Sequence, residues 1–107
     1  MNISVLTPDQ EIFQGAITSV KVPGTLGEFE VLRDHAPIVS SLEKGTVSIV
    51  SASGEQRIYD MESGEIRVMD ESGQRILFDI SGGFIEVLNN EVSLLVRGVG
   101  QMRVEEK

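Results

Sequence analysis

The sequence predicts an all-β fold, an antiparallel sandwich or barrel built from many short strands. Apolar residues alternate with polar ones almost throughout the chain, which is the period of a half-buried strand. Turn-forming residues separate the alternating runs, and no stretch shows a convincing helical period. Short strands at close spacing are typical of sandwiches and barrels. At 107 residues the chain is long enough for one domain with its own hydrophobic core.

The alternation indicates the strands in chain order, and within each run the residues at every second position are expected to share one face. These residues are Ile3 and Val5; Thr18, Val20 and Val22; Val47 and Ile49; Ile76, Phe78 and Ile80; Ile85 and Val87; and Val92, Leu94 and Val96. Turns are expected where proline, glycine, asparagine or charged residues gather between the runs. These turns are Thr7–Asp9, Pro23–Gly24, Glu43–Gly45, Ser53–Gly54, Ser72–Gly73 and Asn89–Asn90.

Two segments in the middle of the chain echo each other. GTVSIVSASGEQ, residues 45–56, and GEIRVMDESGQR, residues 64–75, share the same succession of glycine, alternating β-branched residues and a second glycine. The echo predicts two successive hairpins, arising either from a duplication or from the patterning that hairpins have in common.

An extra hairpin is therefore expected within residues 52–75, protruding from the end of the fold. Its turns should lie near Ser53–Gly54 and Ser72–Gly73. The alternation is interpreted with Ile66 and Val68 facing inward and with Glu65 and Arg67 facing solvent.

The composition restricts the class of protein. Seventeen acidic against nine basic residues give a formal charge of −8, which argues against nucleic acid or an anionic lipid surface as a partner. The absence of cysteine excludes disulfides and fits a reducing compartment. No apolar run approaches the ~20 residues of a membrane span, and MNISVLTPDQ has no signal-peptide pattern. A soluble cytoplasmic domain is expected.

The sequence predicts no catalytic, cofactor or metal site. The only histidine, His35, follows Asp34, but neighbouring side chains in an extended segment point to opposite faces, so Asp34 is not expected to orient His35. One histidine without cysteine does not supply a zinc shell, and the acidic clusters lack calcium-loop spacing. The glycines form no phosphate-binding loop.

The stretch GEFEVLRDHAPIVSSL, residues 27–42, is the most distinctive part of the chain. Pro37 removes an amide donor and restricts Ala36 to an extended conformation, so this charged edge resists pairing with another strand. It is either a protein-docking rim or a capped edge without a partner. A second junction, Gly82–Gly83, is expected to be a bulge or a close approach of two backbones.

Three separated motifs resemble the epsilon subunit of the F-type ATP synthase. They are Thr7-Pro8 with Phe13-Gln14-Gly15, then VPGTLGEFEVLRDHAPIVSSLEKGTVSI, and then SGGFIEVLNNEVSLLV, in the order in which the family has them. The resemblance covers residues 1–51 and 76–97. It implies a two-sheet antiparallel β-sandwich of about ten strands, a non-catalytic subunit without a cofactor, located peripherally at the cytoplasmic face of the bacterial inner membrane.

The resemblance also implies two partners, the gamma subunit and the polar loops of the c-ring, between which the subunit couples rotation. The residues that match c-ring contacts are Glu28, Asp34, His35, Ala36 and Pro37. The residues assigned to the gamma contact are Thr7, Gly82 and Gly83. Because the family's c-ring loops carry arginine, Glu28 and Asp34 are expected to be ion-pair partners.

The chain departs from the long members of this family. The sandwich is expected to span residues 1–97, with 52–75 as an inserted hairpin and 98–107 as a short tail. The tail GVGQMRVEEK is too short for the family's C-terminal helix pair, so no helical domain, no nucleotide site and no self-inhibition are expected.

The competing interpretation is a free-standing β-sandwich module that recognises a sugar or a peptide. Sugar-binding modules usually present exposed tryptophan and tyrosine for stacking. This chain has no tryptophan and one tyrosine, which counts against a sugar ligand.

Overall fold

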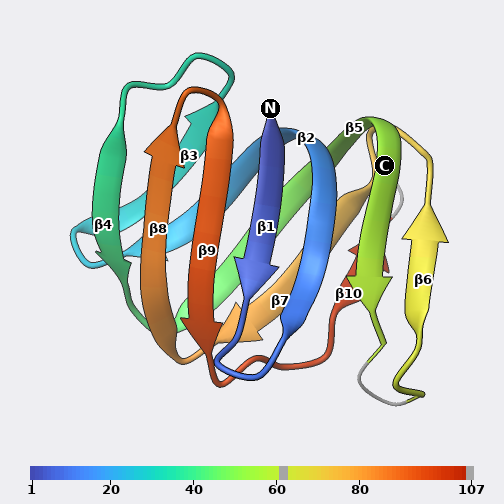
Figure 1. The fold of residues 1–107 in the computed structure, drawn as a ribbon. Helices are drawn as coiled ribbons and strands as arrows, with labels where there is room; N and C mark the ends of the chain where they lie inside the picture. The colour runs from blue at the N-terminus through green and yellow to red at the C-terminus, as the bar shows by residue number, and fades with distance from the viewer. Residues whose placement is uncertain (61–62, 106–107) are drawn as a thin grey trace.

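The computed structural model describes residues 1–60 and 63–105, and this part of the chain forms ten β-strands (Figure 1). The strands are β1 (Asn2–Leu6), β2 (Glu11–Gly24), β3 (Gly27–Leu32), β4 (Ile38–Leu42), β5 (Gly45–Tyr59), β6 (Ile66–Met69), β7 (Arg75–Ile80), β8 (Gly82–Leu88), β9 (Glu91–Arg97) and β10 (Arg103–Glu105). None of the described segments is a helix that could cross a membrane. The predicted all-β fold of about ten strands is confirmed.

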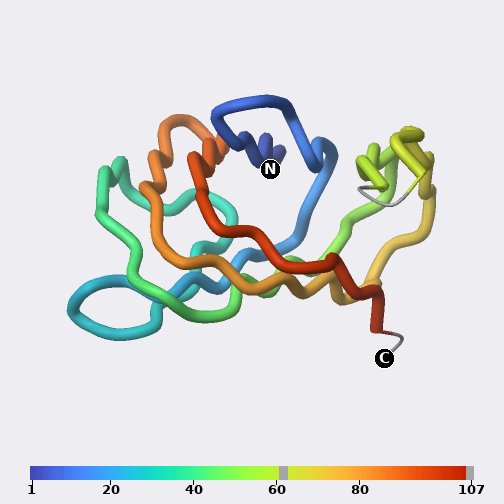
Figure 2. The backbone as a smooth tube through the Cα atoms, turned by 90° about the horizontal axis from the view of Figure 1, so that it is seen from below, coloured from blue at the N-terminus to red at the C-terminus, as the bar shows by residue number. Residues whose placement is uncertain are grey.

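The strands form two layers around one core (Figure 2). Hydrogen bonds connect them in the order β1-β9-β8-β4-β2-β5-β7-β10, while β3 pairs with β2, β6 with β5, and β1 also with β2. All of these pairs are antiparallel except β1–β9, which is parallel. The prediction that all strands are antiparallel is therefore wrong for this one pair, and the sheet is mixed. There the first strand is inserted between β2 and β9.

The two longest strands, β2 and β5, bend between the layers. Their mutual pairing shifts register on both sides of Ile17, which is the signature of bulges. The buried Gln56 holds the bend, because its Nε2 donates to the carbonyl oxygens of Ala16 at 3.0 Å and Ala52 at 2.8 Å. The bulge also explains why Thr18 is exposed, although the alternation predicts it on the buried face with Val20.

The second half of β5 and β6 form the extra hairpin, but not as predicted. Ser53–Gly54 lies inside β5 rather than in a turn, so residues 45–56 form part of one continuous strand and are not a hairpin. The turn at Ser72–Gly73 is confirmed. The connection from β5 to β6 includes residues 61–62, which lie outside the described residues.

The prediction for the faces of β6 is confirmed for Glu65 and Arg67, which are exposed, and fails for the two apolar residues between and after them. Ile66 and Val68 are each 62% exposed, so the prediction that they face inward is wrong. Arg67 pairs with the buried Ile58 and lies on the same side of the hairpin, but it remains exposed at the edge. Alternation separates the two faces of a strand, but only pairing with β5 decides which of them is the inner one.

The core consists of the inward residues of nearly every strand. Its buried members are Ile3, Val5, Ile12, Phe13, Ile17, Val20, Val22, Val31, Leu42, Val47, Ile49, Ile58, Ile76, Phe78, Ile80, Ile85, Val87, Val92, Leu94 and Val96. Apart from Thr18 and the two residues of β6, Ile66 and Val68, every residue that the alternation assigned to a buried strand face is in this core.

The segment after β9 crosses one end of the sandwich (Figure 2). Gly98 adopts a φ of 65°, a region that favours glycine. Val99 and Met102 pack against the core, and β10 then pairs with β7. Three residues are too few to show an alternation, so the sequence does not signal this strand.

Candidate functional site

The β2–β3 hairpin presents the first set of candidate contact residues. Gly24 pairs with Gly27, and the two residues between them form a tight turn in which Leu26 is fully exposed. Gly27 has a φ of 121°, a conformation that favours glycine. Glu28 follows, is exposed, and lines a groove of about 300 Å³ together with Ile38 at the start of β4.

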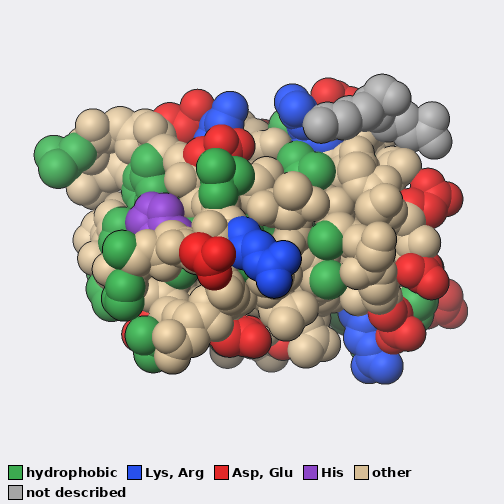
Figure 3. All heavy atoms as spheres, turned by 90° about the horizontal axis from the view of Figure 1, so that it is seen from above, with side chains coloured by type: hydrophobic (Ala, Val, Ile, Leu, Met, Phe, Trp, Pro, Cys, Tyr) green, Lys and Arg blue, Asp and Glu red, His purple; other side chains and the backbone are tan. Residues whose placement is uncertain are grey.

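The loop between β3 and β4, residues 33–37, presents the second set. Asp34, Ala36 and Pro37 are exposed, and His35 is half-buried. The His35 amide donates to the Leu32 carbonyl at 3.1 Å, and its Nδ1 lies 2.7 Å from the Ala36 carbonyl oxygen. The histidine side chain, purple in Figure 3, is visible on the face of the molecule seen from above.

The structure brings four of the five predicted c-ring residues together and places the fifth apart. Asp34, His35, Ala36 and Pro37 share the loop that follows β3. Glu28 lies at the other end of that strand, and its α-carbon is about 13 Å from that of Leu32 at 3.3 Å per residue. The candidate surface is therefore an edge with two contact points.

Asp34 is not positioned to orient His35 for catalysis. Asp34 has a φ of 64°, so the segment is not extended as assumed from the sequence. Its Oδ1 accepts a hydrogen bond from Nδ2 of Asn90 at 3.0 Å, while the imidazole faces its own neighbour Ala36. Among the described residues, no group of three or more His, Asp or Glu side chains could hold a metal ion.

Thr7 and Gly83, two of the residues assigned to the gamma contact, line a second groove. This groove has a volume of about 190 Å³, and Phe84 and Leu95 also line it. Phe84 and Leu95 form a cross-strand pair on the outer face of β8 and β9, and each is about half exposed, at 53% and 54%. Gly82, the third residue, is buried beside the groove and is not part of its lining.

Gly83 confirms the expected close approach of two backbones. A Cβ at this position would overlap the carbonyl oxygen of Leu95 in the neighbouring strand. Phe84 and Leu95 are not among the contact residues predicted from the sequence. The signal was present, because both are apolar at the outward positions of strands whose inward positions are already apolar.

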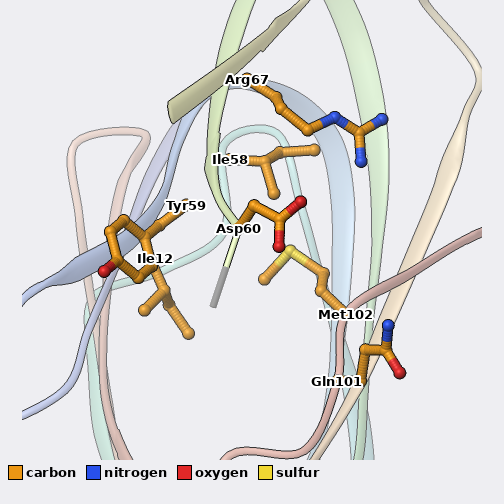
Figure 4. A pocket seen from close by; sticks show the side chains of 7 residues that line it. All are labelled: Ile12, Ile58, Tyr59, Asp60, Arg67, Gln101 and Met102. Atoms are coloured by element: carbon orange, nitrogen blue, oxygen red, sulfur yellow. The ribbon is translucent and has the colours of Figure 1, made fainter. Parts of the chain in front are cut away.

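A third cavity, of about 80 Å³, lies under the β5–β6 hairpin. Its lining residues are Ile12, Ile58, Tyr59, Asp60, Arg67, Gln101 and Met102 (Figure 4). Figure 4 shows Asp60 and Met102 pointing into the same space. The cavity has room for a few water molecules and not for a larger ligand. Tyr59, the only tyrosine, packs against the core and offers no open stacking platform.

Curated relatives match the first half of the chain. The epsilon chain of the ATP synthase of Campylobacter jejuni strain 81-176 is 46% identical over 52 residues, 49% of this chain and 40% of the relative. The epsilon chain of the Rhizobium etli enzyme is 36% identical over 58 residues, 54% of this chain and 43% of the relative. The matched segment thus spans less than half the length of these relatives.

Solved structures share the fold over nearly the whole chain. A chain in the Tetrahymena thermophila mitochondrial ATP synthase structure of the central stalk and c-ring has a TM-score of 0.68 at 16% identity, covering 94% of this chain and 66% of that one. A chain in the Euglena gracilis mitochondrial ATP synthase structure has a TM-score of 0.67 at 20% identity, covering 92% and 51%.

The family described as "ATP synthase, Delta/Epsilon chain, beta-sandwich domain" matches residues 1–64. This range contains the motifs around Phe13 and His35 as well as β1 to β5. Because the match extends over more than half of the 107 residues, the chain belongs to the ATP synthase delta/epsilon β-sandwich domain family.

Proposed function

We propose that this chain is a non-catalytic epsilon subunit of the central stalk of a proton-translocating ATP synthase. The observation that carries the proposal is the family match over residues 1–64, which includes every residue assigned to the c-ring contact. The matching relatives are named epsilon chains, and the similar solved structures come from ATP synthases, one of them described as central stalk and c-ring.

The proposed contact with the c-ring is the edge formed by the β2–β3 hairpin and the 33–37 loop. Glu28 is exposed beside the fully exposed Leu26, so an acidic group and an apolar group project together from the hairpin. Arginines in the polar c-ring loops, which the resemblance implies, would pair with Glu28. Asp34, His35, Ala36 and Pro37 form the second contact point.

The proposed contact with gamma is the outer face of β8 and β9. Phe84 and Leu95 expose apolar surface there, and they share a groove with Thr7 and Gly83. Exposed apolar side chains around a groove favour docking of another protein. Gly82 lies on the same side of β8 as Phe84, and its missing Cβ lets the Arg97 guanidinium lie against the backbone there.

The subunit would transmit work rather than perform chemistry. A proton that crosses the membrane potential releases ~2.3 kcal/mol per 100 mV. Rotation of the c-ring delivers this energy to gamma only if the subunit between them does not deform, and a two-layer sandwich with one continuous core is suited to that task. Such a subunit would lie peripherally at the cytoplasmic face of the bacterial inner membrane.

The test is isolation of the complex from the source cells. An affinity-tagged version of the chain, expressed from its own locus, is expected to co-purify with gamma and the c subunit from detergent-solubilised membranes. Deletion of the gene is expected to lower proton-driven ATP synthesis. Recovery of the tagged chain free of both subunits, with synthesis unchanged after deletion, would overturn the proposal.

A further inference from the structure

We propose that Asn90 is a positioning residue for the c-ring contact, and that Asp34 acts through a hydrogen-bonded clasp with Asn90 rather than through its charge. The inference rests on the proposed function and refines it. The sequence alone suggests Asp34 as an ion-pair partner, and Asn90 only as part of a turn.

The clasp consists of two reciprocal hydrogen bonds between residues 56 positions apart. The backbone amide of Asp34 donates to Oδ1 of Asn90 at 2.7 Å, and Nδ2 of Asn90 donates to Oδ1 of Asp34 at 3.0 Å. Both residues have positive φ, 64° and 63°, a conformation that asparagine and aspartate tolerate better than most residues. The clasp therefore joins two tight turns, one at Asp34 and one at Asn90.

Asn90 joins three separate parts of the chain. It is the second residue of the two-residue turn between β8 and β9. Its carbonyl accepts a hydrogen bond from the Asn2 amide at 3.0 Å, at the start of β1. Its side chain holds the loop after β3 through Asp34. Movement of the loop is thereby tied to the β8–β9 turn and to the start of β1.

Among the described residues, no other hydrogen bond joins this loop to a distant part of the chain. The remaining hydrogen bonds described for residues 33–37 stay within or next to the loop: His35 amide to Leu32, and His35 Nδ1 to Ala36. Pro37 has no amide to donate. The clasp is thus the hydrogen-bonded link that holds His35, Ala36 and Pro37 in place before a partner docks.

A loop that is already ordered loses less conformational entropy when a partner docks. The domain therefore binds that partner more tightly. Because one oxygen of the Asp34 carboxylate already accepts the Asn90 amide, the carboxylate is partly committed within the molecule. Glu28, whose side chain is exposed at the hairpin, keeps its charge available to the c-ring.

The first arm of the test compares two glycine substitutions in one turn. Asn90→Gly removes the clasp but keeps a residue that accepts a positive φ, so the turn is retained. Asn89→Gly is the matched control, because Asn89 also has a positive φ, 51°, and is not part of the clasp. We expect Asn90→Gly to speed amide exchange at Asp34 about tenfold and to weaken binding to the detergent-solubilised c-ring–gamma complex about three- to tenfold. Asn89→Gly should do neither.

The second arm separates the clasp from the charge. Asp34→Asn keeps both hydrogen bonds with Asn90 and removes the charge, so it should weaken binding less than Asn90→Gly does. Asn90→Asp places two carboxylates together and should weaken binding. The double variant Asp34→Asn with Asn90→Asp should restore binding, because the side-chain amide introduced at position 34 can donate to the carboxylate introduced at position 90.

The outcomes distinguish this inference from the proposed function. Failure of the wild-type chain to bind the c-ring–gamma complex would overturn the proposed function and the docking role of the clasp with it. Two results would overturn this inference alone. One is that Asn90→Gly binds as tightly as the wild type, and the other is that Asp34→Asn loses binding while Asn90→Gly retains it.

Discussion

Glu28 is the single residue on which the proposed c-ring contact depends most. It is exposed at the end of a tight hairpin and pairs through its backbone with Pro23, so its side chain contributes little to the stability of the isolated domain. Under the proposal, its charge would instead pair with arginines in the loops of the c-ring.

Substitution of Glu28 by lysine is therefore expected to separate stability from binding. The melting temperature should change by no more than about 2–4 °C, which corresponds to a surface effect of about 0.5 kcal/mol. Binding to the c-ring–gamma complex should weaken about tenfold or more, because an attraction becomes a repulsion. Differential scanning calorimetry and a binding titration check the two expectations.

Glu65→Lys is the matched control, since Glu65 is also exposed but precedes β6 on the extra hairpin. It reverses the same charge away from the proposed contact and should leave binding unchanged. Equal weakening by both variants would show that only net charge matters and that Glu28 has no specific role.

At the scale of elements, the pairing of β8 with β9 depends on one of two adjacent glycines. A Cβ at Gly83 would overlap a backbone carbonyl oxygen, which has no room to move within the sheet. A Cβ at Gly82 would meet the guanidinium of Arg97 at 2.6 Å, and this is the flexible end of an exposed side chain.

Gly83→Ala should thus destabilise the domain by about 2–3 kcal/mol, in the range of overpacked sites, and Gly82→Ala by less than about 1 kcal/mol. Urea unfolding of the two variants measures the difference. Unfolding of both alanine variants at the same urea concentration would contradict the close approach of Gly83 to the Leu95 carbonyl oxygen.

The extra hairpin offers a second test at this scale. Ile58 on β5 is 6% exposed, while Ile66 on β6 is 62% exposed. Ile58→Thr should cost about 2 kcal/mol or more, because it places a hydroxyl in the core, and Ile66→Thr should stay within about 0.5 kcal/mol. Equal losses in urea unfolding would restore the sequence-based prediction that Ile66 faces inward.

Much of this architecture could be predicted from the sequence. The alternation identified most of the core positions, since every second residue of a half-buried strand faces the core. It did not identify Ile12, Phe13, Ile17, Val31, Leu42 or Ile58. The bend in β2 could not be predicted, because the bulges beside Ile17 depend on pairing with β5. The inward face of β6 was missed for the same reason, and β10 is too short to show a period.

The candidate site was predictable in part. Motifs indicated Glu28 and the loop around His35, and a pair of glycines indicated the approach at Gly83. The Asp34–Asn90 clasp was not predictable, because it joins two turns that are distant in the sequence and that only the fold brings together. The apolar pair of Phe84 and Leu95 is visible in the pattern once the outward positions are considered.

For the molecule as a whole, the chain is compact, and hydrogen-bonded strand pairing joins its two layers into a closed ring. The radius of gyration is 12.6 Å, against about 13 Å expected for a compact domain of this length. Because β1 pairs with both β2 and β9, strands β1, β9, β8, β4 and β2 form a closed ring of pairings. The link between β2 and β4 rests on one residue pair, Gly24 with Leu42, next to the proposed c-ring edge.

Two different faces of this domain are proposed to meet two different subunits, the β2–β3 edge the c-ring and the outer face of β8 and β9 gamma. The chain contains no cysteine, so a cysteine introduced at any position is unique within it. Single variants Glu28→Cys, Phe84→Cys and Ile66→Cys can each be labelled with a photoactivatable crosslinker and assembled with the c-ring and gamma. All three positions are exposed in the isolated domain.

The measurement is the identity of the crosslinked subunit, read by mass spectrometry after illumination of the assembled complex. We predict that position 28 crosslinks to the c subunit, that position 84 crosslinks to gamma, and that position 66 crosslinks to neither. Crosslinks from position 28 to gamma, or the same product from all three positions, would contradict the two-face arrangement.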